Sequence, residues 1–210
     1  MTSPALALLA AAGMFALLDW LAVARERKPL EYVAKPAALL CLVGVAATLD
    51  PADPTRRGWF VAALALSLVG DVFLMLPRDA FVAGLASFLL AHLAYIVGFH
   101  FEGGSGVAVA GAALVLLVPI ALLGRVILGA VRERSPSLLG PVTAYMAVIG
   151  FMVAKALADG DPVAASGALL FFASDALIAW NRFVRPFPRA RLAIMVTYHL
   201  GQAGLVLSLL

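Results

Sequence analysis

Long apolar runs alternate along the chain with short segments that are rich in charged residues, proline and glycine. Each run holds about 20 residues, which as an α-helix is long enough to cross the ~30 Å hydrocarbon core of a bilayer. The expected helices span residues 4–24, 30–49, 58–77, 79–101, 106–130, 137–158, 162–182 and 189–209. The pattern predicts an all-α polytopic membrane protein of about eight transmembrane helices, with a single domain over residues 1–210.

The composition agrees with this pattern. Hydrophobic residues make up 64% of the 210 and charged residues 13%, whereas soluble proteins have roughly a half and roughly a quarter. A water-soluble fold could not cover so much apolar surface. The first run has no basic segment before it and contains Asp19, so we expect a retained helix and not a cleaved signal peptide. Cys41 is the only cysteine, which excludes disulfides within the chain.

Basic residues favour one side of the predicted membrane domain. Assigning successive loops to alternate sides places eleven arginines and lysines on one face, and only Arg56 and Arg57 on the other. By the positive-inside rule the first face is cytoplasmic, so we expect a bacterial inner membrane protein with both termini outside. Because these residues are dispersed among loops, no nucleic acid partner is expected. The basic face holds Arg25, Arg27, Lys28, Arg78, Arg125, Arg132, Arg134, Arg182, Arg185, Arg189 and Arg191.

The third and seventh predicted helices share a short pattern. In each, a small residue precedes an aspartate, Asp71 or Asp175, and the following helix carries a histidine, His92 or His199. A four-plus-four parallel duplication would give these helices matching orientations. The lysines within the helices do not follow this repeat, so an unrepeated bundle is the alternative.

Several ionisable side chains fall inside the predicted helices. Counted from the basic face at 1.5 Å per residue, most of them lie about 8 to 15 Å deep, with His92 deeper at ~20 Å. Such groups cost several kcal/mol unless they pair or line a wet cavity. We therefore expect them to face one another around a cavity that opens toward the inner leaflet. The layer contains Asp19, Lys35, Asp71, Tyr145, Asp175 and His199.

Each of these residues also has a purely structural interpretation. Lys35 lies close enough to the boundary to extend toward water, and Asp19 could be its counter-ion. Either buried histidine, taken alone, could be a core residue held by hydrogen bonds. Asp71 and Asp175 are too deep for their short side chains to reach water, which favours a functional role for both.

Five short motifs follow one another along the chain. They are Lys35-Pro36, Gly70-Asp71-Val72-Phe73-Leu74, Ala91-His92-Leu93-Ala94-Tyr95, Ser174-Asp175 and Tyr198-His199-Leu200-Gly201-Gln202. Together they resemble the YhhN-like lysoplasmalogenase family over nearly the whole chain. The resemblance implies hydrolysis of the vinyl ether bond of a lysoplasmalogen, an alkenyl-glycerophosphocholine or -ethanolamine, to a fatty aldehyde and a glycerophospho-alcohol. It also implies a lysophospholipid substrate and membrane lipids as partners.

Vinyl ether hydrolysis needs a group that protonates an alkene carbon and a group that helps water to capture the resulting oxocarbenium ion. Two buried carboxyls suit this task, because one can hold a proton while the other is ionised. We expect them at one cavity, with a histidine that orients water or relays protons, and with no cofactor or metal. The predicted catalytic residues are Asp71, Asp175, His199, His92 and Tyr198, and the predicted substrate-binding residues are Lys35, which could hold the phosphate, Tyr145 and Ser174.

Two other functions remain open. Buried aspartates and histidines also serve as proton relays in transporters, although the paired Gly/Pro-broken helices expected of such proteins are missing here. A metal-dependent lipid hydrolase is the second alternative, with two histidines and two aspartates as zinc ligands. No HExxH-like spacing supports it. Its candidate ligands are His92, His199, Asp71 and Asp175.

Overall fold

The computed structural model describes residues 1–49, 53–77, 79–99 and 105–210. Over these residues the chain forms eight α-helices, one short 3-10 helix and one π-helical turn, and no strand. They are α1 (Ser3–Ala24), α2 (Lys28–Thr48), α3 (Pro54–Met75), α4 (Phe81–Gly98), α5 (Gly106–Arg134), η1 (Pro136–Leu138), α6 (Leu139–Asp159), α7 (Pro162–Ala179), η2 (Trp180–Val184) and α8 (Ala190–Leu207). The expected helix order is confirmed, while Arg78 and the expected helix end at residue 101 lie outside the described residues.

Short polar side chains and prolines set the helix starts. The Asp53 carboxylate accepts a hydrogen bond from the Thr55 amide at 2.7 Å, and the Asp161 carboxylate caps α7 in the same way. Proline follows both caps, where its missing N–H is not needed. At its other end α7 widens into the π-helical turn η2, a change of pitch that the apolar run gave no reason to expect.

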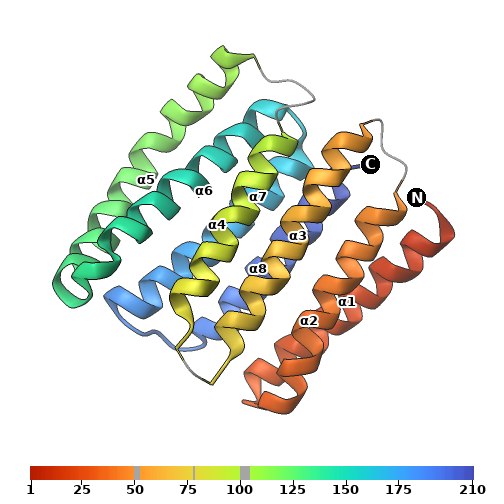
Figure 1. Cartoon of the computed structure of the whole chain (residues 1–210), viewed down its shortest axis with the longest axis horizontal. Coiled ribbons are helices and arrows are strands. Elements are labelled where there is room, and N and C mark those ends of the chain that lie inside the picture. Colours follow the sequence, from red (N-terminus) through yellow and green to blue (C-terminus); the bar gives the residue numbers. More distant parts are fainter. Residues whose placement is uncertain (50–52, 78, 100–104) are drawn as a thin grey trace.

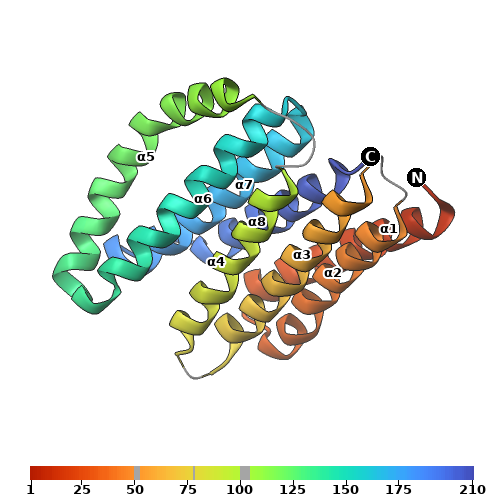
Figure 2. The same ribbon diagram turned by 45° about the horizontal axis from the view of Figure 1, so that its top comes forward.

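The helices lie side by side; α1–α2, α2–α3, α3–α4, α5–α6, α6–α7 and α7–α8 pack as neighbours, whereas α4 packs against α6 (Figure 1). α1 and α2 form one edge of the bundle, α5 and α6 the other, and α8 packs against α1, α2, α3 and α7. Figure 2 shows α5 standing at the outer edge beside α6. Both termini lie at the end of the bundle opposite the loops that follow α1 and α3 (Figure 1). This arrangement agrees with loops on alternating sides.

Seven of the described helices, α1 to α7, are long and apolar enough to cross a membrane, counting η1 with α6 and η2 with α7. α8 is less apolar because it carries Arg191, His199 and Gln202. The outer surface is apolar too: on α5, the Val107 and Val115 side chains are 82% and 74% exposed. The prediction of an all-α polytopic membrane protein is therefore confirmed.

Backbone contact between α7 and α8 fixes how these two helices face each other. A Cβ atom added at Gly167 would lie 2.6 Å from the Leu205 amide nitrogen, and one at Gly201 would lie 2.7 Å from the Phe171 nitrogen. Small residues permit such close approach in membrane proteins. The α3–α4 pair is also close, with Gly70 against the Phe88 ring. The four-plus-four duplication itself stays a prediction.

Candidate active site

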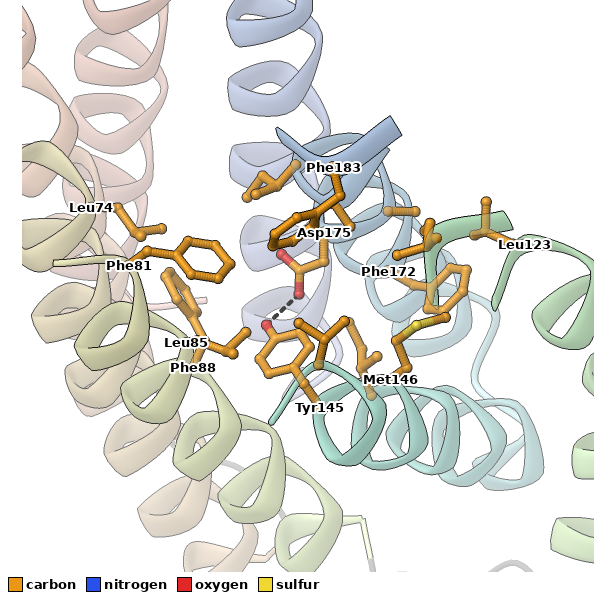
Figure 3. A pocket seen from close by; sticks show the side chains of 16 residues that line it. Leu74, Phe81, Leu85, Phe88, Leu123, Tyr145, Met146, Phe172, Asp175 and Phe183 are labelled. Carbon is orange, nitrogen blue, oxygen red and sulfur yellow. Dashed lines mark hydrogen bonds between the residues drawn. The ribbon is translucent and has the colours of Figure 1, made fainter. Parts of the chain in front are cut away.

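A largely apolar cavity lies between α4, α5, α6 and α7, near the bundle end that carries the basic loops (Figure 3). About 640 Å³ of space in and around it, the open mouth included, is free of protein atoms. Its walls are aliphatic and aromatic, and include Leu85, Phe88, Leu123, Met146, Ile149 and Phe172. The only polar side chains among the described residues that line it are Tyr145 and Asp175.

The Asp175 carboxylate is the centre of the first polar cluster. The Tyr145 hydroxyl donates to Asp175 Oδ2 at 2.6 Å, the bond drawn in Figure 3. His92 Nε2 lies 3.2 Å from the same oxygen and 2.9 Å from the Tyr145 hydroxyl. The Asp175 side chain keeps 12% of its surface exposed toward the cavity, while His92 is fully buried. Three elements, α4, α6 and α7, thus bring an acid, a phenol and an imidazole together at the cavity wall.

The Asp71 carboxylate belongs to a second, closed cluster. Lys35 Nζ pairs with Asp71 Oδ1 at 2.9 Å, and the Tyr198 hydroxyl donates to Asp71 Oδ2 at 2.7 Å. Behind them, the Gln202 amide donates to the Tyr198 hydroxyl at 3.4 Å and its carbonyl oxygen accepts from Tyr95 at 2.7 Å. All five side chains are buried. Both oxygens of this carboxylate therefore have a protein partner.

Aromatic rings separate the two clusters. The Phe171 ring centroid lies 4.8 Å from that of His92 and 5.4 Å from that of Tyr198, and Phe88 packs edge-on against both Phe171 and Tyr198. The charge of Asp175 still acts on Asp71 electrostatically. The sequence predicts that both aspartates line one cavity. In the structure only Asp175 lines it.

A third polar group lies between α1 and α8. Trp20 Nε1 donates to His199 Nδ1 at 3.0 Å, whereas His199 Nε2 has no hydrogen-bond partner among the described residues. The Asp19 carboxylate is also buried, and neither of its oxygens is hydrogen bonded there. Lys35 pairs with Asp71 and acts on Asp19 only electrostatically. His199 thus makes no hydrogen bond to either predicted catalytic aspartate among the described residues.

The predicted substrate-binding residues end up in different places. Tyr145 lines the cavity, whereas the Ser174 hydroxyl donates to the Ile194 carbonyl at 3.2 Å and ties α7 to α8. The Lys35 ammonium group is held by Asp71 and does not line the cavity, so a phosphate bound there needs another cation.

Metal ligation has a weak basis in this arrangement. Of the four candidate ligands, His92 and Asp175 share one cluster, whereas Asp71 and His199 belong to the other two. Within the described ranges, no group of three or more His, Cys, Asp or Glu side chains is placed to hold a metal ion.

Three participants were not predicted as site residues. Gln202 belongs to the last motif but had no assigned role, although it lies one helical turn after Tyr198 and so shares its face. Tyr95 could be recognised only through its bond to Gln202. Trp20 has the position of a membrane-interface residue, and nothing in its sequence context pointed to His199.

Comparison with known proteins places the chain among membrane enzymes. The sequence model of the YhhN family matches residues 30–209. Lysoplasmalogenase TMEM86B from Homo sapiens is 37% identical over 172 residues, covering 82% of this chain and 72% of that protein. Lysoplasmalogenase TMEM86A from Homo sapiens is 32% identical, covering 75% and 67%. A lysoplasmalogenase from Mycobacterium bovis is 35% identical, covering 70% and 58%. No solved structure matches the chain significantly.

Proposed function

The chain belongs to the YhhN family, and from this premise we propose that it is a lysoplasmalogenase that hydrolyses its substrate inside the membrane. The observation that carries the proposal is the Asp175 carboxyl group, which faces an apolar cavity in a relative of named lysoplasmalogenases. Such a substrate has one apolar chain and one polar end. The aliphatic and aromatic walls suit the alkenyl chain, and in this proposal the vinyl ether lies beside Asp175, which lines the same cavity.

The chemistry begins with a proton on Asp175. The acid transfers this proton to the alkene carbon that is farther from the ether oxygen, and the double-bond electrons form the new C–H bond. The resulting oxocarbenium ion is stabilised by the carboxylate just formed. Water then adds to the carbon next to the oxygen and returns a proton to Asp175. The hemiacetal collapses to a fatty aldehyde and a free glycerol hydroxyl, so one water is consumed.

The neighbouring groups support this cycle. Tyr145 and His92 hold the carboxyl of Asp175 in place, and the imidazole can pass protons to it. In this proposal Asp71 is the second carboxylate, held by Lys35 and Tyr198 behind the aromatic rings.

The test is turnover of a defined lipid by the purified protein. A lysoplasmenyl lipid should release fatty aldehyde, measured by trapping the aldehyde, while the saturated alkyl ether analogue should bind without reacting because it has no alkene carbon to protonate. An ester-linked lysolipid should be a poor substrate. If it is hydrolysed as fast as the vinyl ether, the enzyme uses acyl transfer chemistry and the proposal is wrong.

We also propose that the basic end of the bundle is cytoplasmic, so that the cavity opens near the inner leaflet and both termini are outside. A reporter fused after Leu210 should be active only on the outer side of a bacterial inner membrane. A cytoplasmic signal would reverse this orientation without changing the site.

A further inference from the structure

A second, polar hollow adjoins the apolar cavity at the basic end of the bundle. It lies where α3 ends, α4 begins and η2 turns, and it shares Leu74 and Phe81 with the cavity. Among the residues that the structure describes, its charged lining residues are Asp79 and Arg182. Since the two spaces share these residues, they lie next to each other, and the hollow is within reach of the polar end of a molecule whose chain fills the cavity.

The two charges in the hollow form an open ion pair. Arg182 Nη2 lies 2.7 Å from Asp79 Oδ2, and the two side chains are 37% and 68% exposed. Hydrogen bonds from Arg182 and from the Phe81 amide lower the pKa of Asp79, so its carboxylate is ionised at neutral pH. A pair this exposed contributes little to folded stability. A ligand that carries opposite charges can therefore replace either contact without unfolding the protein.

The local fold fixes the position of Arg182. Its guanidinium carbon lies 4.1 Å from the centroid of the Phe81 ring, which packs edge-on against Phe183 at 5.7 Å. Arg134 holds the π-helical turn by donating to the carbonyls of Phe183 and Val184, both at 2.7 Å. The turn thereby gives Phe183 to the apolar cavity and Arg182 to the polar hollow.

We propose that this hollow binds the zwitterionic phospho-alcohol headgroup of a lysolipid, with Arg182 contacting the phosphate and Asp79 the ammonium group. This assignment rests on the proposed function, which identifies the occupant of the cavity as the alkenyl chain of a lysolipid. Guanidinium groups suit phosphate oxygens, which they bind through two parallel N–H donors. The Asp79 carboxylate, whose side chain is 68% exposed, offers the ammonium group a counter-charge.

The spacing along the chain matches such a ligand. Arg182 follows Asp175 by seven residues, a rise of ~10 Å if the helical rise of α7 continues through η2. In a lysoplasmalogen, about seven bonds separate the alkene carbon that accepts the proton from the phosphorus atom, or ~8 Å when extended. One lipid molecule can therefore present its vinyl ether to Asp175 while its phosphate reaches Arg182.

The experiment compares Arg182→Gln and Asp79→Asn with a matched control, Arg191→Gln. Arg191 also lies at the basic end and pairs with Glu31 at 2.6 Å, but it lines neither space. Three substrates are used: an alkenyl-glycerophosphocholine, an alkenyl-glycerophosphate without the amine, and an uncharged alkenylglycerol. We measure kcat and KM for each combination.

Arg182→Gln should raise KM about tenfold for both phosphorylated substrates, with kcat within about twofold, and leave alkenylglycerol unchanged. Asp79→Asn should raise KM for the choline lipid alone. Arg191→Gln should change none of these values, and Arg182→Lys should restore part of the loss. Equal effects of Arg182→Gln and Arg191→Gln, or an equal effect on alkenylglycerol, would show that no headgroup site exists here.

Failure of the proposed function gives a different result. If the wild-type protein turns over no alkenyl lipid, the reaction assigned above is wrong, and the headgroup site is tested by binding instead. The saturated alkyl-glycerophosphocholine should then bind the wild-type protein about tenfold more tightly than the Arg182→Gln variant. Equal affinity for the two proteins would overturn the headgroup site.

Discussion

Asp71 and Asp175 each follow a small residue in a helix that packs closely against the next one, and the protein surrounds them in opposite ways. The Asp71 carboxylate has a lysine on one oxygen and a tyrosine on the other, in a network that continues to Gln202. The hydrogen bonds of Asp175 fall on one oxygen, Oδ2, and its side chain faces a cavity. One carboxylate is closed by the protein, and the other is left open to a ligand.

The difference shows how a membrane protein can use one residue type for two purposes. The buried Lys35–Asp71 ion pair, together with Tyr198, holds α2, α3 and α8 in one arrangement. Removing one partner of the pair leaves the other charge buried without a counter-charge. A partly bonded carboxyl still has the capacity to give or take a proton. Stability and turnover should therefore respond differently to substitutions in the two clusters.

The largest expected effect follows from Asp175→Asn. The amide keeps the size and most hydrogen bonds of the acid but cannot transfer the proton, so turnover per folded molecule should fall by roughly 10²–10⁴-fold. The midpoint of thermal unfolding should change little. Ser174→Ala is the control on the adjacent position, because its hydroxyl bonds to the Ile194 carbonyl and does not line the cavity. Near-normal turnover of Asp175→Asn would remove it from the chemistry.

Loss of the Lys35–Asp71 ion pair should lower the stability of the folded protein. Asp71→Asn leaves the Lys35 ammonium group buried without a counter-charge, which should lower the free energy of unfolding by about 3 kcal/mol. Lys35→Met in the same chain removes the stranded charge and should recover most of this loss. Unfolding in detergent and turnover per folded molecule are measured for the single and double variants.

The double variant also decides whether Asp71 takes part in the reaction. If Asp71 acts as the second carboxylate, the double variant should turn over substrate at least tenfold more slowly than the wild-type protein, even when its stability has recovered. If turnover returns with stability, Asp71 has only a structural role. If instead Asp71→Asn unfolds like the wild-type protein and loses as much turnover as Asp175→Asn, the two clusters do not differ as described.

The smallest expected effects come from one hydroxyl in each cluster. Tyr145→Phe removes the shorter bond to Asp175 and should lower turnover about tenfold, since a hydrogen bond to a charged group contributes roughly 1.5–3 kcal/mol. Tyr198→Phe should lower the free energy of unfolding by about 1 kcal/mol and change turnover less. If the two variants lose turnover and stability to the same extent, the two clusters do not differ as described.

Hydropathy was enough to predict the helices, because a helix that crosses a bilayer must be about 20 residues long and apolar. The polar layer followed from the cost of burying charges. Which charge meets which could not be predicted, because it depends on how each helix is rotated about its axis. Ser174 and Asp175 are adjacent, yet one bonds to α8 and the other faces the cavity, as successive residues on a helix point about 100° apart.

The π-helical turn was also beyond the reach of the sequence pattern. Trp180–Val184 follows α7 directly and contains no proline or glycine that would mark a change of pitch. The turn depends on Arg134, the last residue of a helix that ends 46 residues before the turn begins. For a related reason the alternative in which Asp19 is the counter-ion of Lys35 is not found: Lys35 pairs with Asp71, because α2 packs on α3.

The glycine contact between α7 and α8 has a consequence for mutational mapping. Gly167 and Gly201 have no group that could take part in a reaction, yet any side chain at either would push the two backbones apart. The displaced helices carry Asp175 and Tyr198, one from each polar cluster, so both clusters would move together. A screen for inactive variants would thus recover these glycines as readily as the aspartates, and sensitivity to substitution alone would not reveal which positions carry the chemistry.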